Sequence, residues 1–129
     1  MTPEYIEAPA LAEIVTNETQ RAKVLVIDVR SLDERREGHV AGSRHISSDR
    51  FLDALPALRK ELTSETCPYS VVVTHCALSQ VRGPKAARRL LDALEDAEHR
   101  PTVKVLRLGF EGWLDQDIPR QFPGSTEGM

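Results

Sequence analysis

Cysteine is scarce in this chain of 129 residues, which contains only Cys67 and Cys76. Two cysteines are too few for the disulfide framework of a small extracellular domain, and too few for a zinc site built from cysteines. The four histidines are scattered, without the spacing of metal ligands. We therefore expect no structural disulfides and no bound metal.

Long hydrophobic runs and an excess of basic charge are also missing. No segment is apolar over the roughly 18 residues that a membrane-spanning helix requires. The formal net charge is −3 with both signs interspersed, which argues against a nucleic-acid-binding surface. The first fifteen residues lack the basic and apolar segments of a secretory signal. We expect neither a membrane nor a nucleic acid as a partner. We expect a cytoplasmic location, with the nucleus as an alternative.

Apolar segments of two kinds alternate along the chain. Three β-branched segments are predicted strands, at residues 23–29, 70–75 and 103–109. Three segments with apolar residues at helical spacing are predicted helices, at residues 8–15, 47–62 and 83–96. Pro56 predicts a kink in the second helix or its division into two short helices. This order predicts an α/β domain whose mostly parallel central sheet carries helices on both faces.

Residues 75–84, HCALSQVRGP, place a thiol at the end of a predicted strand and an arginine at the start of the next helix. Ligands of α/β sheets bind beyond the carboxyl ends of the strands. A helix N-terminus favours the thiolate form of a cysteine, here Cys76, and its unpaired N–H groups can hold an oxyanion. Arg82 can donate two parallel hydrogen bonds to such an anion. The segment therefore predicts a nucleophile and an anion clamp acting on one tetrahedral centre.

An inert buried cysteine and a surface arginine are the alternative interpretation of the same segment. A lone cysteine would favour it, because cysteine is among the most buried residue types. Four joint features favour catalysis instead: the strand end, the spacing from Cys76 to Arg82, the following Gly83-Pro84 and the helix behind them. For Cys67, which precedes Pro68, packing is the better interpretation. The predicted anion-binding loop consists of Ala77, Leu78, Ser79, Gln80 and Val81.

The same ten residues resemble the active-site loop of the small Cdc25-like phosphatases and the eukaryotic arsenate reductases, a branch of the rhodanese superfamily. Residues 24–46, VLVIDVRSLDERREGHVAGSRHI, resemble the opening segment of rhodanese domains, and residues 106–113, LRLGFEGW, resemble their closing segment. The resemblance covers residues 5–120, nearly the whole chain, and implies a rhodanese-like fold. We expect residues 121–129 to form a loose C-terminal tail.

The resemblance implies an enzyme that acts on tetrahedral oxyanions, with Cys76 as nucleophile and Arg82 as clamp. Five residues separate the two, as in the phosphatase and arsenate-reductase branch, whereas sulfurtransferases of the superfamily have a loop one residue shorter. The implied substrates are arsenate, phosphate or a phosphorylated molecule. The implied reactions are arsenate reduction, with glutathione and glutaredoxin as external reductants and no bound cofactor, and tyrosine-phosphatase-type hydrolysis of phosphomonoesters.

Several polar residues outside the loop could be interpreted as a catalytic set: Asp28, Arg30, His39 and Ser43. The resemblance implies instead that Asp28 and Arg30 organise the loops beside the site. His75 and Gly83, which flank the loop, complete the predicted supporting residues. Glu111 is the candidate for a general acid, because it lies in a predicted loop after the third predicted strand, at the same edge of the sheet.

Three departures from the family pattern refine the prediction. Val29 stands where Cdc25 phosphatases carry a second cysteine that can protect the nucleophile as a disulfide. Residues 77–81 include no acidic residue, unlike the Cdc25 loop, and the cysteine-rich, metal-binding tail of plant relatives is not found. We therefore expect no metal, no internal resolving thiol and poor turnover of alkyl phosphates.

Two other functions compete with oxyanion chemistry. A thiosulfate-type sulfurtransferase is disfavoured by the length of the loop. A non-catalytic rhodanese-like interaction module is disfavoured because such a module needs neither Cys76 nor Arg82. Between arsenate reduction and phosphoester hydrolysis the sequence favours arsenate, since the loop offers no carboxyl group to protonate a leaving alkoxide.

Overall fold

The structure, a computed structural model, describes residues 2–129 and confirms the α/β prediction. Within these residues, the central sheet has five parallel strands in the order β1-β6-β5-β2-β4. A separate antiparallel ribbon pairs β3 with β7. The strand bounds are β1 Glu4–Ile6, β2 Val24–Asp28, β3 His39–Val40, β4 Arg44–His45, β5 Val71–His75, β6 Thr102–Leu106 and β7 Thr126–Glu127.

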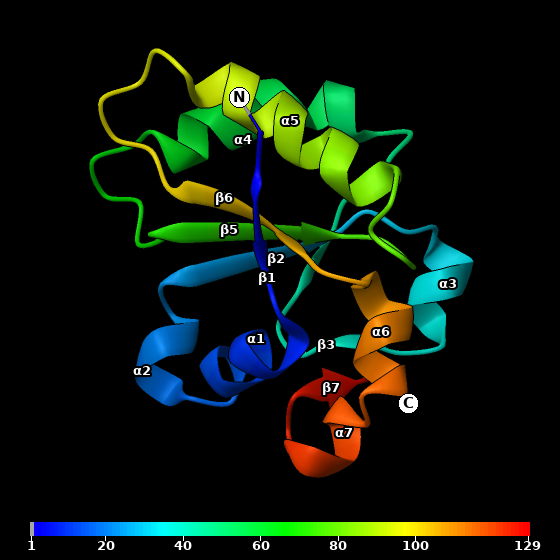
Figure 1. The fold of residues 1–129 in the computed structure, drawn as a ribbon. Coiled ribbons are helices and arrows are strands. Elements are labelled where there is room, and N and C mark those ends of the chain that lie inside the picture. The colour runs from blue at the N-terminus through cyan, green and yellow to red at the C-terminus, as the bar shows by residue number, and fades with distance from the viewer. Residues whose placement is uncertain (1) are drawn as a thin grey trace.

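Helices cover both faces of the sheet, as predicted. One face carries α4 (Phe51–Leu62) and α5 (Arg82–Leu94), and the other carries α1 (Ala8–Val15) and α2 (Glu18–Arg21), as Figure 1 shows. At the edge where β5 ends lie α3 (Leu32–Arg36) and α6 (Gly109–Asp115), and α7 (Ile118–Gln121) follows beside the β3–β7 ribbon. Among the described residues, no helix combines the length and the apolar character needed to cross a membrane.

Alternation along the strands divides the core into two layers. Ile27 and Val72 pack among the residues of α4 and α5, whereas Val26 and Val73 pack among those of α1 and α6. All four side chains are buried, and each contributes about 1.5–3 kcal/mol relative to an exposed position. The near-continuous apolar sequence of β2 and β5 follows from this, because both faces of a parallel sheet are covered.

The predicted helices and strands differ from the observed ones mainly at their ends. The first helix has the predicted bounds, whereas α4 begins only at Phe51 and is one continuous helix, so the alternative of two short helices is wrong. Pro56 removes the hydrogen bond to the carbonyl of Leu52, which lies on the exposed side where water can replace it. The third predicted strand ends at Leu106 because Leu108 and Gly109 adopt left-handed backbone angles.

The C-terminal residues also differ from the expectation of a loose tail. Val40 and Thr126 pair in the β3–β7 ribbon, and the Ser125 carbonyl accepts a hydrogen bond from Ala41 at 2.8 Å. Ser125 is fully buried, and Trp113 donates its indole N–H to the Thr126 hydroxyl at 2.9 Å. Residues 121–129 are therefore part of the folded domain, since backbone pairing with β3 fixes them.

Candidate active site

The thiol of Cys76 lies where β5 ends and α5 begins. The backbone N–H of Gly83, in the first turn of α5, donates a hydrogen bond to Sγ with 3.2 Å between nitrogen and sulfur. Such a donor at a helix N-terminus stabilises an anionic sulfur. Cys76 is only 3% exposed, but its side chain reaches a hollow of about 170 Å³ lined by residues of the loop.

The loop between Cys76 and α5 leaves its backbone N–H groups free. Among the described residues, no acceptor is found for the N–H groups of residues 77–82. The carbonyl oxygens of Cys76 and Ala77 instead accept hydrogen bonds from Phe110 and Glu111 at the start of α6, at 3.0 and 2.8 Å. Ser79 adopts a left-handed conformation with φ 56°, which curves the chain. Successive free N–H groups on a curved backbone form a concavity that binds anions.

Arg82 opens α5, and its guanidinium is held by Glu34 of α3. Glu34 Oε1 and Oε2 accept hydrogen bonds from Nη1 and Nη2 of Arg82 at 2.7 and 3.0 Å. The bond from Arg82 lowers the pKa of Glu34 to about 2, although partial burial opposes the shift. Sequence reasoning missed Glu34. Its one local signal was the Ser31-x-x-Glu34 capping box at the start of α3, which accounts for helix capping and not for the contact with Arg82.

Asp28 and Arg30 form a buried ion pair at the carboxyl end of β2. Arg30 donates to both carboxylate oxygens of Asp28, at 3.0 and 2.9 Å, and to the carbonyl of Gly38 at 2.7 Å. The guanidinium also lies 4.4 Å from the ring centre of Phe110. Burial raises the pKa of Asp28, but the hydrogen bonds and charges of its neighbours, those of Arg30 first among them, together outweigh burial and hold that pKa at about 2. The pair connects β2, α3 and α6 beneath the loop, and neither side chain lines the hollow at Cys76.

His75 is buried directly beneath Cys76. Its Nδ1 lies 3.1 Å from the carbonyl oxygen of Cys76, which can only accept, so Nδ1 carries the proton. Burial lowers the pKa of His75, against the opposing field of Asp28, so the ring is neutral. Among the described residues, its Nε2 has no hydrogen-bond partner. His75 therefore supports the loop from below.

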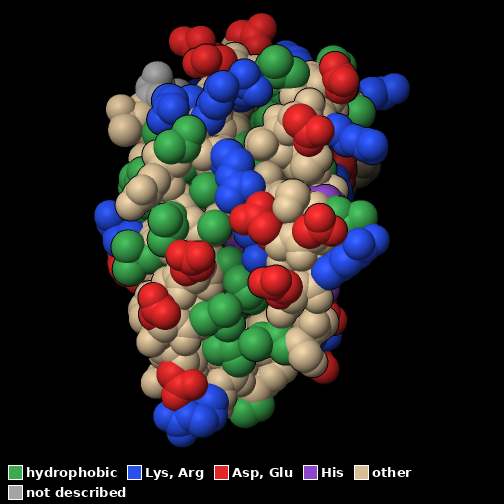
Figure 2. Space-filling model, turned by 90° about the vertical axis from the view of Figure 1, so that its right-hand side faces the viewer, with side chains coloured by type: hydrophobic (Ala, Val, Ile, Leu, Met, Phe, Trp, Pro, Cys, Tyr) green, Lys and Arg blue, Asp and Glu red, His purple; other side chains and the backbone are tan. Residues whose placement is uncertain are grey.

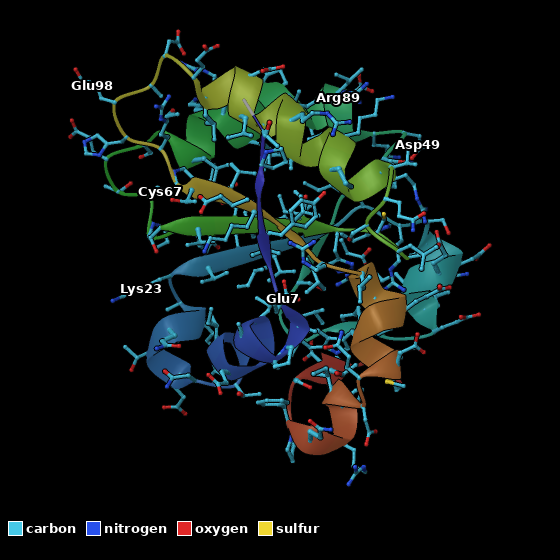
Figure 3. All side chains as sticks on the ribbon, in the orientation of Figure 1. Glu7, Lys23, Asp49, Cys67, Arg89 and Glu98 are labelled. Carbon is cyan, nitrogen blue, oxygen red and sulfur yellow. The ribbon has the colours of Figure 1, made fainter. Side chains whose placement is uncertain are left out.

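The other residues considered from the sequence lie apart from the sulfur. Glu111 stands exposed in the first turn of α6, where its backbone contacts the loop, rather than in a loop of its own. Ser43 accepts a hydrogen bond from Arg35, and His39 contacts Glu127. Cys67 precedes β5 at the opposite end of the sheet from the active-site loop, as Figure 3 shows. Among residues 2–129, no group of histidine, cysteine and acidic side chains is placed to hold a metal.

Figure 2 looks onto the end of the molecule that carries the site, where hydrophobic side chains lie between acidic and basic ones. Leu78 and Val81 of the loop are among the exposed hydrophobic residues. A second hollow of about 160 Å³ adjoins the first and shares Val81 and Arg82 with it. Its wall includes Lys85 and Arg89 of α5, so basic side chains flank the site on that side.

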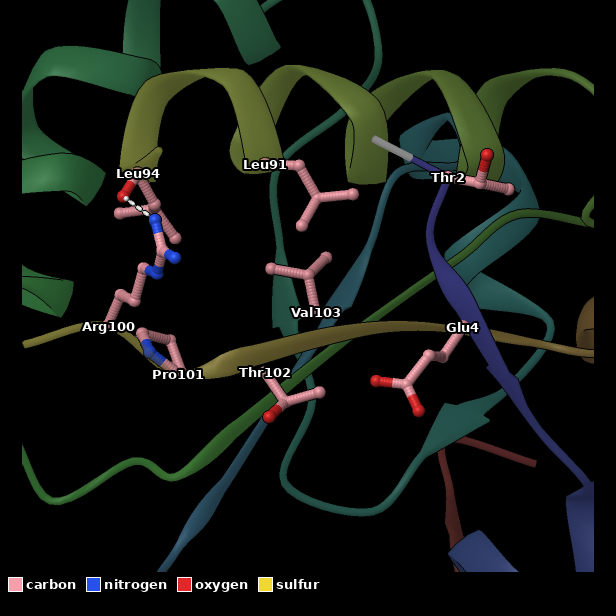
Figure 4. A pocket seen from close by; sticks show the side chains of 8 residues that line it. All are labelled: Thr2, Glu4, Leu91, Leu94, Arg100, Pro101, Thr102 and Val103. Atoms are coloured by element: carbon pink, nitrogen blue, oxygen red, sulfur yellow. Dashed lines mark hydrogen bonds between the residues drawn. The ribbon is translucent and has the colours of Figure 1, made fainter. Parts of the chain in front are cut away.

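Another hollow lies at the β1 edge of the sheet, away from this site. It measures about 250 Å³ and is open between α5, β6 and the start of β1 (Figure 4). Arg100 crosses one end and donates to the carbonyl of Leu94 at 3.1 Å. Its lining contains no cysteine and no histidine: Thr2, Glu4, Leu91, Leu94, Arg100, Pro101, Thr102 and Val103. This hollow at the β1 edge therefore lacks the thiol that marks the candidate site.

Comparisons with known proteins show what the chain is similar to. Residues 11–116 match the family model described as "Rhodanese-like domain". The chain is 38% identical over 112 residues to arsenate reductase 2.2 of Oryza sativa subsp. japonica, covering 84% of this chain and 80% of that protein. Among solved structures, it resembles Ygr203w, a yeast protein tyrosine phosphatase of the rhodanese family, with a TM-score of 0.79, 30% identity and coverage of 99% and 94% of the two chains. The As-Sb reductase of Leishmania major gives a TM-score of 0.71 at 28% identity, with 88% and 78% covered.

Proposed function

The chain belongs to the rhodanese-like domain family, and on that premise we propose that it is a cysteine-thiolate enzyme whose preferred substrate is arsenate. The observation that supports this most directly lies in the loop that follows the Cys76 thiol. Among the described residues the N–H groups of residues 77–82 have no acceptor, and the thiol itself already accepts a hydrogen bond from Gly83. Donors fixed in place before the reaction stabilise charge that develops on the oxygens of a tetrahedral centre. Relatives named arsenate reductase and As-Sb reductase support the same substrate class.

The proposed reaction begins with attack of the Cys76 thiolate on arsenic(V). One arsenate oxygen leaves as water after protonation, and a bond forms between Sγ and arsenic. A glutathione thiolate then attacks Sγ, and the electron pair of the S–As bond leaves with arsenic, which is released as arsenite, As(III). Glutaredoxin or a second glutathione reduces the mixed disulfide and restores the thiolate. Two thiols are oxidised for each arsenic reduced by two electrons.

The acids near the loop favour arsenate over alkyl phosphates. An alkoxide leaving group needs a proton from a positioned acid. Glu34 and Asp28 both have pKa values of about 2 and are ionised near neutral pH, so neither can donate that proton. Glu111 is exposed on α6. Arsenate loses water instead, and its later steps use an external thiol, which agrees with a shallow site close to the surface.

Hydrolysis of phosphomonoesters is the second candidate activity. The hollow beside the site, with Lys85 and Arg89 on its wall, can accept the remainder of an anionic substrate. The likeness to the yeast protein tyrosine phosphatase supports this candidate as well. Aryl phosphates have good leaving groups and depend less on a general acid, so we expect modest turnover of aryl phosphates and poor turnover of alkyl phosphates.

Arsenate reduction needs external thiols such as glutathione. These thiols are those of a reducing compartment such as the cytoplasm.

The test compares three assays on one preparation of the purified protein. These are arsenite release from arsenate with glutathione and glutaredoxin, hydrolysis of a tyrosine phosphopeptide, and thiocyanate formation from thiosulfate and cyanide. We expect arsenate to give the highest kcat/KM, the C76S variant to lose turnover and the C67S variant to retain it. A phosphopeptide value at least ten times larger, without detectable arsenite, would assign the protein as a phosphatase instead.

A further inference from the structure

Glu34 has no role in the chemistry proposed above, yet its carboxylate lies directly on the guanidinium of the anion clamp. It belongs to α3, which lies at the end of the sheet where β5 ends (Figure 1) and is distant in sequence from Cys76 and Arg82. Both oxygens accept from Arg82, at 2.7 and 3.0 Å, and both side chains are 35% exposed. A carboxylate in this place either competes with the substrate for Arg82 or holds Arg82 in position.

The geometry of the pair separates these two roles. A guanidinium has five N–H donors, and Glu34 takes one from each terminal nitrogen, Nη1 and Nη2. Among the described residues, no hydrogen bond is found on the other edge of Arg82, formed by Nε–H and the adjacent Nη–H. That edge presents two parallel donors, which suit two oxygens of a tetrahedral anion. The substrate and Glu34 can therefore bind Arg82 together, on different edges.

Glu34 is itself fixed. Its Oε1 accepts the backbone N–H of Ser31 at 2.9 Å, and its own N–H donates to the Ser31 hydroxyl at 3.2 Å. Its carbonyl lies 3.3 Å from Nη1 of Arg30, which is anchored to Asp28 at the end of β2. A carboxylate held at so many points does not swing toward and away from the site. It serves as a rigid support for a long side chain that otherwise samples many rotamers.

We propose that Glu34 is a positioning residue that holds Arg82 with its Nε edge toward the anion bound over Cys76. The inference rests on the proposed oxyanion function and adds a residue that acts through Arg82 without touching the substrate. Loss of this support lets Arg82 move relative to the anion, and displacements of about 1 Å in an active site can reduce rates by as much as a hundredfold. If the Glu34 carboxylate instead competed with the substrate for Arg82, its removal would have the opposite effect and would strengthen anion binding.

The test measures how arsenate protects Cys76 from alkylation by iodoacetamide, followed by mass spectrometry without any turnover. We expect wild-type protein to be protected, and E34Q to require on the order of ten times more arsenate for half protection. E34A should require at least as much. The matched control is D33N, the adjacent carboxylate of α3, which pairs with Arg36 and does not contact Arg82. D33N should stay within twofold of wild type.

Turnover supplies a second measurement. The KM for arsenate should rise in E34Q by about the factor seen in the protection assay, while the KM for glutathione stays unchanged. Equal or tighter protection in E34Q would overturn the inference and leave the proposed function standing. Failure of arsenate to protect the wild-type protein at any concentration would overturn the proposed function, and this inference with it.

Discussion

The backbone N–H of Phe110 donates a hydrogen bond to the carbonyl oxygen of Cys76, with 3.0 Å between nitrogen and oxygen. This bond and the neighbouring one to Ala77 bring the start of α6 against the active-site loop. The contact is possible only because Gly109 has no side chain. A Cβ at Gly109 would lie 2.5 Å from the carbonyl oxygens of Cys76 and Ala77, and its φ of 60° is left-handed.

We predict that G109A destabilises the domain and disturbs the loop. The left-handed conformation costs a non-glycine residue about 1–2 kcal/mol, and the clash with backbone oxygens adds to it. We expect a loss of about 3 kcal/mol or more in the free energy of unfolding, measured by urea denaturation, together with reduced arsenate turnover in the folded fraction.

The control for this prediction is G124A. Gly124 also has a left-handed φ, 87°, but no atom lies within 4 Å of its added Cβ. G124A therefore carries only the backbone cost, about 1–2 kcal/mol, and should leave the kcat of the folded protein unchanged. Equal destabilisation by the two substitutions would show that the contact between α6 and the loop is not as close as described.

We predict that R82K weakens catalysis by about 2–4 kcal/mol, the scale of losing one preorganised oxyanion donor. Lysine keeps the positive charge but cannot bind Glu34 with one edge and an anion with another. The measurement is kcat/KM for arsenate. R88K, on an exposed position of the same helix, is the matched control and should behave as wild type. A change within twofold in R82K would mean that Arg82 does not contact the substrate.

The placement of Cys76 and Arg82 on one loop at the end of a strand could be predicted from the sequence because their geometry is local. Cys76 and Arg82 are six residues apart, and the strand, loop and helix between them fix their relation. Glu34 could not be found in this way, because its contact with Arg82 spans 48 positions of the chain and depends on how α3 packs beside α5. The tight contact at Gly109 likewise became visible only once α6 lay against the loop.

The fold shows the same division between local and distant information. The β-branched runs and the helical spacing predicted the central strands and the covering helices, because parallel sheets bury both faces. The prediction that residues 121–129 are loose follows from the general tendency of chain termini to be poorly ordered. Their order comes from pairing with β3, a partner more than eighty residues away, which no local pattern reveals.

We predict that acid destabilises the domain through His75. Burial lowers the pKa of His75 in the folded protein below its ordinary value of 6.5, so the unfolded chain binds an additional proton at mildly acidic pH. Stability should therefore rise with pH and be lost as the pH falls below about 6.5. The paired carboxylate of Asp28 contributes a further loss only below its ordinary pKa of 3.8.

Urea midpoints between pH 7.5 and 5 provide the measurement for His75. H75N keeps an N–H donor for the carbonyl of Cys76 but does not titrate, so its midpoint should vary less with pH over this range. H99N, at an exposed histidine, should retain the wild-type slope. The assignment fails if H75N and wild type lose the same stability between pH 7.5 and 5.

Finally, we predict that peroxide inactivates the enzyme without forming an internal disulfide. Cys67 and Cys76 lie beyond opposite ends of β5. The five residues of β5 each extend the chain by about 3.3 Å. The distance between the two Cα atoms is therefore greater than the roughly 7 Å that a disulfide permits. Val29 is buried in the same hydrophobic cluster as Cys76, and its N–H donates to the carbonyl of His75. The sulfenic acid of Cys76 should therefore react with added glutathione or oxidise further.

V29C, which places a thiol where Cdc25 phosphatases have one, should form a 29–76 disulfide instead and recover full activity with dithiothreitol. Peptide mass spectrometry of the oxidised native proteins distinguishes these products, and a dominant Cys67–Cys76 link in the wild type would contradict the separation of the two thiols across the sheet.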